Sequence, residues 1–400
     1  MTTMPDEKTE DLKGDAQPAF VPKAGGADPF ATRLIAELKH DRGILTCRYD
    51  AAGRFLFAGA RDYLLHRWDL SQKPVVVPPA DPKTKPKVPP IPVAPAESQT
   101  EGAGHESWIS SLALFNDNDR LVSGDFVGRL IVWSNRTSQP KPQFSFEAHE
   151  GSIRKVALSP DQKLVATAGN DGAVRVWHAD AEKKLRHELL GHGCHVYQVA
   201  FHPDGKSLIS ADLKGIIKHW NVEDGKLIRE IDASPLYTYS EKYQVDVGGI
   251  RGMTFSSDGG QLACAGATGD KGIAHSGNAR VLLFDWDTGQ MLQELKPEKV
   301  EVCTAWGVEF HPDGFIVASG GSRTGGFLWF WTPTDEVAFH MVKFQQRAPG
   351  FDLAIAPDKK TLAVANHDGA VRLYEMAKEE PVSEATSSSA FSSQNDVRKF

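Results

Sequence analysis

The feature that most constrains the fold of this 400-residue chain is a repeat defined by the spacing between a histidine and a tryptophan. In four segments the two residues stand 28 positions apart, and the residues between them follow one pattern. The pairs are His40 and Trp68, His105 and Trp133, His149 and Trp177, and His192 and Trp220. A spacing that recurs four times indicates one supersecondary unit copied along the chain.

Three looser copies of the unit follow the four regular ones. They run through residues 250–286, 308–331 and 351–374, and the first has a long glycine-rich loop, 266–277, inserted in it. The chain therefore contains seven copies. Architectures of this kind grow by adding units, so the length of the chain does not by itself require two domains.

Each copy contains short strand-forming segments separated by turn residues. Turns such as Pro203-Asp204-Gly205 and Asn170-Asp171-Gly172 combine a fixed φ, side-chain hydrogen bonding and tolerance of positive φ. A further strand-forming segment follows the tryptophan of each unit, for example at 144–147, 185–190, 226–231 and 291–295. Four short antiparallel strands per unit are typical of a propeller blade, so we predict an all-β, seven-bladed β-propeller.

The repeats resemble those of the WD-repeat family over about residues 29–376. The mark of that family is a buried relay of His, Ser or Thr, Asp and Trp. The third unit contains all four as His149, Thr167, Asp171 and Trp177. The resemblance implies that this network satisfies the polar atoms at the blade edge and fixes the strand register.

The other units carry the relay only in part. The first has His40, Asp62 and Trp68 with Ala58 at the hydroxyl position, the second has His105, Ser123 and Trp133, the fourth has His192, Ser210 and Trp220, and the last keeps Asp368. Val127 and Lys214 stand where the second and fourth units are expected to have an aspartate. We expect blades five to seven to depend more on apolar packing.

The resemblance also implies that the ring closes by pairing the two ends of the domain. Residues 31–38 have the pattern of an outer strand but belong to no unit of their own, and the last unit lacks an outer strand. We therefore predict that residues 31–38 form the outer strand of the last blade. We expect a disordered segment over 1–28, the propeller over 29–378 and a disordered Ser-rich tail over 379–400. A proline-rich insertion, 72–103, is expected in blade one as a solvated loop or as a ligand for a proline-binding domain.

In the family, partners commonly bind the face that carries the loops before the first strand and between the second and third strands. The repeat spacing places ten residues there: Arg61, Trp108, Phe126, Arg154, His195, Tyr197, Arg251, Trp306, Phe351 and His367. Large aromatic side chains and arginine dominate binding hot spots. The alternative is that these aromatic side chains fill the channel or pack between blades.

No motif in the sequence points to catalysis, a metal or a cofactor. The run from His192 to His195 contains Cys194 and could suggest a metal, but His192 already has a place in the relay. We therefore predict a non-catalytic scaffold that binds a peptide or partner domain on the loop face. The alternative is a propeller hydrolase or lyase with its active site at the channel mouth, which converging acids and a perturbed histidine would favour. A structural subunit that uses the blade sides also stays open.

Charge and composition limit where such a protein works. A net charge of −7 and a pI near 6.1 argue against nucleic-acid binding. The sequence contains neither a signal-peptide pattern nor an apolar run of membrane-spanning length. The four cysteines form no CxxC pair, as expected for reduced thiols. We expect a stand-alone cytoplasmic protein, monomeric by itself, with a protein or peptide partner.

Overall fold

The fold is described from a computed structural model. It describes residues 20–71, 104–136, 140–273, 276–298, 302–322, 325–344 and 347–378, without the side chains of 270–273 and 276. The expected proline-rich insertion, Ser-rich tail and most of the expected N-terminal disordered segment lie outside these residues, so those domain assignments stay predictions.

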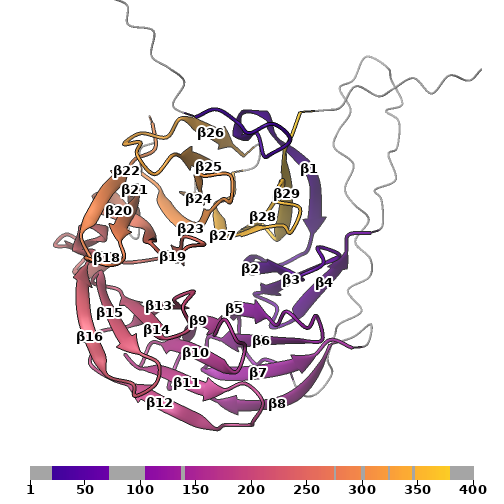
Figure 1. Cartoon of the computed structure of the whole chain (residues 1–400), viewed down its shortest axis with the longest axis vertical. Helices are drawn as coiled ribbons and strands as arrows, with labels where there is room; N and C mark the ends of the chain where they lie inside the picture. Colours follow the sequence, from indigo (N-terminus) through magenta and orange to yellow (C-terminus); the bar gives the residue numbers. More distant parts are fainter. Residues whose placement is uncertain are drawn as a thin grey trace, which may run out of the picture.

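Within the described residues, the blade strands form seven antiparallel sheets arranged in a ring, each with one edge strand nearest the axis (Figure 1). Blade one contains β2 (Ile44–Tyr49), β3 (Phe55–Ala60) and β4 (Leu65–Asp69). Blade two contains β5 (Ile109–Leu114), β6 (Arg120–Asp125), β7 (Arg129–Ser134) and β8 (Lys141–Glu147). Blade three contains β9 (Ile153–Leu158), β10 (Leu164–Gly169), β11 (Val174–His178) and β12 (Leu185–Leu189). Blade four contains β13 (Val196–Phe201), β14 (Ser207–Asp212), β15 (Ile216–Asn221) and β16 (Leu227–Asp232).

The remaining blades keep the same strand order. Blade five contains β19 (Gly252–Phe255), β20 (Gln261–Ile273), β21 (Ser276–Asp285) and β22 (Met291–Leu295). Blade six contains β23 (Thr304–Phe310), β24 (Ile316–Ser322), β25 (Gly325–Trp331) and β26 (His340–Lys343). Blade seven contains β27 (Gly350–Ile355), β28 (Thr361–Asn366), β29 (Ala370–Met376) and β1 (Thr32–Lys39). The predicted seven-bladed propeller is thus confirmed.

Closure of the ring follows the prediction from the sequence. The N-terminal strand β1 pairs antiparallel with β29, with Leu38 opposite Val371, and becomes the outer strand of blade seven (Figure 1). Leu38 is fully buried. Because the first and last strands of the domain share one sheet, the ring has no open blade at which it could unravel.

Burial explains why the middle strands are apolar on both faces. All six residues of β10 are buried, and so are all six of β14. A middle strand packs against a neighbouring blade on each face of its sheet, so the side chains on both faces are buried. Each large apolar side chain buried in this way contributes about 1.5–3 kcal/mol.

Two segments differ from the prediction. The expected disorder over 1–28 is wrong for 20–28, because Phe20 and Ala27 are buried and the Ala27 N–H donates to Asp313 at 2.8 Å. A short 3₁₀ helix, η1 (Pro29–Ala31), then leads into β1. The glycine-rich segment 266–277 is not a simple loop, because it lengthens β20 and β21 into a hairpin paired as far as Ile273 and Ser276.

One further element lies between blades four and five. The 3₁₀ helix η2 (Ser234–Leu236) precedes a separate hairpin of β17 (Tyr237–Ser240) and β18 (Val245–Gly248). Among the described residues, no helix has the length and apolar character that crossing a membrane requires.

Candidate binding site at the mouth of the channel

The relay predicted for blade three is joined by hydrogen bonds in the structure. Trp177 Nε1 donates to Thr167 Oγ1 at 3.0 Å, and that hydroxyl lies 2.7 Å from His149 Nε2. His149 Nδ1 lies 2.9 Å from Asp171 Oδ1. Each hydrogen bond of this relay has one donor and one acceptor if the imidazole carries its proton on Nδ1 and accepts at Nε2. The network thereby ties the loop before the blade to its second and third strands.

Blades two and four also contain a complete relay, and the prediction that Val127 and Lys214 leave them without an aspartate is wrong. The carboxylate comes instead from the last residue of the second strand, Asp125 or Asp212. Asp125 Oδ2 lies 2.8 Å from His105 Nδ1. The remaining contacts match blade three: Ser123 with His105 and Trp133, Asp212 with His192, and Ser210 with His192 and Trp220.

The carboxylate can act from this position because its second oxygen caps the turn that follows. Asp125 Oδ1 accepts from the backbone N–H groups of Val127 at 3.1 Å and Arg129 at 2.9 Å. Asp212 Oδ1 accepts in the same way from Lys214 and Ile216. One side chain therefore fixes both the histidine and the turn.

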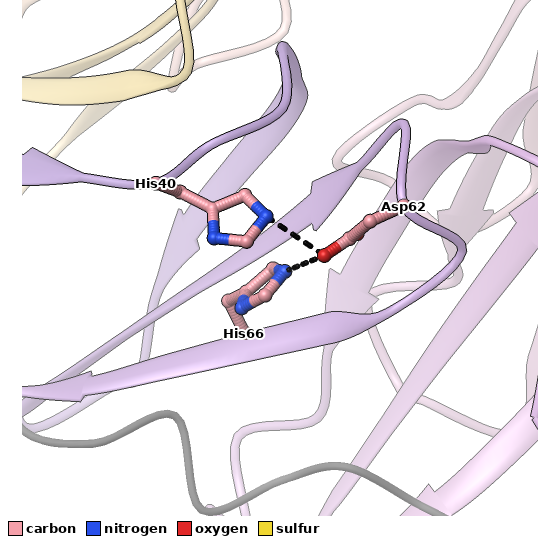
Figure 2. Close-up of side chains that lie close together, drawn as sticks. All are labelled: His40, Asp62 and His66. Carbon is pink, nitrogen blue, oxygen red and sulfur yellow. Dashed lines mark hydrogen bonds and ion pairs between the residues drawn. The ribbon is translucent and has the colours of Figure 1, made fainter.

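Blade one replaces the relay by a His–Asp–His cluster. Figure 2 shows His40 and His66 directed at the same carboxylate, that of Asp62. The Nε2 atoms lie 2.7 and 2.9 Å from Asp62 Oδ2, and the two ring centroids are 4.1 Å apart. Burial, followed by His66, lowers the pKa of His40. His66 also stacks on Trp68, so its ring contacts both His40 and Trp68, the two residues that a hydroxyl joins in the other relays.

The chemistry of this cluster is compatible with a metal, since the three ligand atoms lie within 4.8 Å of one another. The 2.9 Å between His66 Nε2 and Asp62 Oδ2 is, however, an ordinary hydrogen bond, and His40 Nε2 lies at ion-pair distance from the same oxygen. In blade seven, no histidine among the described residues hydrogen-bonds to Asp368. It binds Arg372 through both carboxylate oxygens, at 2.6 and 3.0 Å.

Eight of the ten residues predicted on the loop face line one central cavity of about 280 Å³. They come from all seven blades and form a closed circuit of neighbours, which we call the Arg–aromatic ring. Its order is Arg61, Trp108, Phe126, Arg154, Tyr197, Arg251, Trp306, Phe351 and back to Arg61. Consecutive members lie 4.4 to 5.9 Å apart, measured between ring centroids or from a guanidinium carbon to a centroid.

The other two predicted residues lie beside the ring and do not line the cavity. His367 is exposed, with Nε2 3.3 Å from Arg61 Nη1 and its imidazole 5.5 Å from the Phe351 ring. His195 is also exposed, and its Nδ1 lies 2.6 Å from the carbonyl oxygen of Asn170. The members of the Arg–aromatic ring are half-buried, and Trp108 is 36% exposed. They converge on one opening and are not sealed into the core.

β-Bulges direct several of these side chains toward the cavity. Arg154, Tyr197, Trp306 and Phe351 each occupy the position at which the pairing of the first and second strands skips one residue. A bulged residue has no partner across the ladder, and the local bend turns its side chain away from the regular alternation. Four blades thus place a ring member by the same local device.

The cavity also contains a charged cluster that sequence reasoning missed, which we call the inner cluster. It consists of Arg48, Lys155, Glu309 and Asp352. Arg48 Nη1 lies 2.6 Å from Asp352 Oδ2, which also accepts from Thr46 Oγ1 at 2.7 Å. Arg48 and Glu309 also line a second cavity of about 290 Å³, so they lie between the two spaces.

Burial and neighbouring charge act in opposite directions within the inner cluster. Burial acts to raise the pKa of Asp352, but Arg48 and Lys155 outweigh it and the pKa is lowered. Burial raises the pKa of Glu309 in spite of the same two cations. It lowers the pKa of Lys155, as does Arg48. Charged residues in the innermost strands were the available sequence signal.

A second exposed surface lies on the outer strands of blades three to five. Large apolar side chains there are about half exposed: Leu185 on β12, Leu227 and Ile228 on β16, and Met291 and Leu292 on β22. Exposed apolar side chains on outer strands can also contribute to protein binding. It gives a structural basis to the alternative in which the blade sides make the contacts.

Comparison with known proteins gives partial matches. Residues 97–134, 140–178 and 183–221 match the family model for the WD domain, G-beta repeat. Protein hir-1 of Neurospora crassa is 25% identical over 161 residues, 40% of this chain and 15% of that protein. The target of rapamycin complex subunit LST8 of Saccharomyces cerevisiae is 35% identical over 91 residues, 22% of this chain and 30% of that protein. The human kinesin-like protein KIF21A is 28% identical over 127 residues, 32% of this chain and 6% of that protein.

The matched regions span less than a third of each of these relatives. They therefore concern the repeat and not the whole of any relative. Three repeats that match the family model, three complete relays and a closed ring of seven blades together support a WD-repeat β-propeller protein.

Proposed function

We propose that the protein is a non-catalytic interaction scaffold that binds a peptide or a partner domain on the Arg–aromatic ring. The observation that carries this proposal is the closed circuit of five aromatic and three arginine side chains around one cavity. Such side chains supply most of the binding energy in protein interfaces, because they are large, stiff and rich in donors. All seven blades contribute side chains, so the folded propeller preorganises the Arg–aromatic ring before a partner binds.

Members of the WD-repeat family generally act as scaffolds. The name of the yeast relative places it in a complex with other proteins, which supports a protein partner here as well. The four cysteines carry free thiols, and we further propose that the chain works in the cytoplasm, by itself a monomer.

The cavity argues for binding over hydrolase or lyase chemistry. Two acids, Glu309 and Asp352, reach it, but no histidine is among its described lining residues. Asp352 is held by Arg48 and Thr46, and Glu309 lies 3.3 Å from the Thr254 hydroxyl. The acids thus serve in a packed charge cluster, without the histidine that such chemistry most often uses.

The experiment is an affinity purification of the full chain from lysate of its source, followed by mass spectrometry. A ring variant, Trp108→Ala/Arg154→Ala/Trp306→Ala, is compared with an outer-strand variant, Leu227→Ala/Ile228→Ala. Both are checked for native thermal unfolding. Partners that the ring variant loses and the outer-strand variant keeps support the proposal. The reverse pattern moves the interface to the blade sides, and equal retention by both variants rejects the Arg–aromatic ring as the interface.

A further inference from the structure

The arginines of the Arg–aromatic ring are unusual in lacking acidic partners. Arg61, Arg154 and Arg251 form no ion pair with a carboxylate among the described residues. Arg154 Nε donates to the side-chain carbonyl of Asn170, and Arg61 faces His367. The Nε atoms of Arg61 and Arg251 are buried without a hydrogen-bond partner in the described part of the chain.

Burial makes these unpaired charges costly. It lowers the pKa of all three guanidinium groups, since no carboxylate offsets the loss of hydration. The faces of Trp108, Tyr197 and Trp306 offset only part of this loss, because a cation–π contact contributes about 0.5–2 kcal/mol. Donor groups held in this state bind an incoming anion more strongly than hydrated ones do.

The charge of the cavity differs in sign from that of the chain. Five basic and two acidic side chains line it, a local balance of +3, whereas the whole chain carries −7. The inner cluster is neutral as a unit, with two cations and two carboxylates. The excess positive charge therefore belongs to the three arginines of the Arg–aromatic ring, where a half-enclosed cavity concentrates the field.

From these observations we propose that the Arg–aromatic ring recognises an oxyanion, a carboxylate or phosphate group, carried by the bound peptide and flanked by apolar residues. This inference rests on the proposed function and adds the chemistry of the ligand. Arginine forks pair with both oxyanions in bidentate fashion, and the aromatic members cover the neighbouring apolar groups. Negative charge elsewhere on the protein repels acidic segments, which directs them to this opening.

The test uses the full chain and two kinds of probe. The first is an array of capped ten-residue peptides in matched sets, with randomised apolar flanks and a central Glu, phosphoserine, Gln or Lys. The second is inorganic phosphate, titrated against sodium chloride at equal ionic strength and followed by tryptophan fluorescence, since Trp108 and Trp306 lie in the ring. The test variant is Arg61→Gln/Arg251→Gln, and the matched control is Arg186→Gln, on the outer strand β12 and paired with Glu223. Native thermal unfolding is required of each variant.

We expect Glu and phosphoserine peptides to bind at least about tenfold more tightly than their Gln and Lys counterparts. The preference should disappear in the test variant and persist in the control. Peptides that bind the Arg–aromatic ring without a preference for negative charge, or with one for Lys, would overturn this inference and leave the proposed function intact. Phosphate binding that the test variant loses, with no peptide bound, would support oxyanion recognition with a free ligand and contradict the proposed function. Binding of neither probe would overturn both.

Discussion

The hydroxyl of Thr167 is the most informative single group in the fold, because it joins two other members of the blade-three relay. The side chain is fully buried. It accepts from Trp177 Nε1 and lies within hydrogen-bond distance of His149 Nε2. Thr167→Val keeps the shape of the side chain and removes only this oxygen. The substitution therefore leaves two buried polar atoms without a partner.

The expected destabilisation follows from those two atoms. Each buried polar group left unpaired costs about 1–3 kcal/mol, and the added methyl group recovers part of this. We expect the free energy of unfolding to fall by about 2–4 kcal/mol. Thr361→Val is the matched control, because the Thr361 hydroxyl bonds to Asp358 at an exposed turn and its loss should cost less than about 1 kcal/mol.

Urea unfolding, followed by tryptophan fluorescence and by circular dichroism, measures both effects. The two signals are compared because coincident transitions are needed before a single free energy can be assigned. A cost for Thr167→Val no greater than that for Thr361→Val would refute the reasoning, since the relay would then contribute nothing beyond packing.

Three further predictions concern other residues. Asp212→Asn should lower the free energy of unfolding by about 1–3 kcal/mol, because Asp212 bonds to His192 and to the amides of the turn. Asp224→Asn, an exposed change, should have little effect. Equal losses in urea unfolding would contradict the assignment of Asp212 to the relay. Burial, then Arg229, lowers the pKa of His219 to about 4, so the unfolded chain binds the proton first as pH falls. The free energy of unfolding should therefore fall by about 1–2 kcal/mol as the pH is lowered from above about 6.5 to 5. His219→Phe should weaken this pH dependence, and an unchanged dependence in that variant would contradict the assignment to His219. Zinc at micromolar concentration should not raise the thermal midpoint, because His40 and His66 already bind Asp62; a rise that His66→Ala abolishes would reveal a metal site.

The fold could be predicted because each blade repeats its own signals. The fixed spacing in sequence from His149 to Trp177 reflects a relay that spans the blade. Turn residues between these two positions mark the ends of the strands. The ring closure that the resemblance implied, together with the count of strands, then assigned the N-terminal strand to the last blade. These are local or periodic properties, which a sequence displays directly.

The errors arose where one chemical role can be filled from two backbone positions. The relay carboxylate comes from the turn in blade three, as Asp171, and from the preceding strand end in blade two, as Asp125. In blade one, which has Ala58 at the hydroxyl position, the ring of His66 contacts His40 and Trp68 and bonds to Asp62. A repeat alignment compares positions, whereas the network requires only that an atom reach the right place.

The binding face could be predicted as a set of residues but not as a continuous circuit. Its closure depends on the bulges that aim Arg154 and Tyr197 at the cavity, and a skipped ladder position leaves no clear mark in the sequence. The pairing of Arg48 with Asp352 joins blades one and seven, residues more than 300 positions apart. Such contacts follow from the closed ring and not from any local pattern.

Whether partners bind the Arg–aromatic ring is tested most directly by site-specific photocrosslinking. The photoreactive residue p-benzoylphenylalanine is placed at Phe126, in the Arg–aromatic ring, and in a second protein at Leu227, on the exposed outer strand β16. Each full-length protein is irradiated in lysate of its source, and covalent adducts are resolved by electrophoresis and identified by mass spectrometry. We predict a specific adduct from position 126 that excess unlabelled protein competes away, and none from position 227. An adduct formed only from position 227 would contradict binding at the Arg–aromatic ring and assign it to the blade sides.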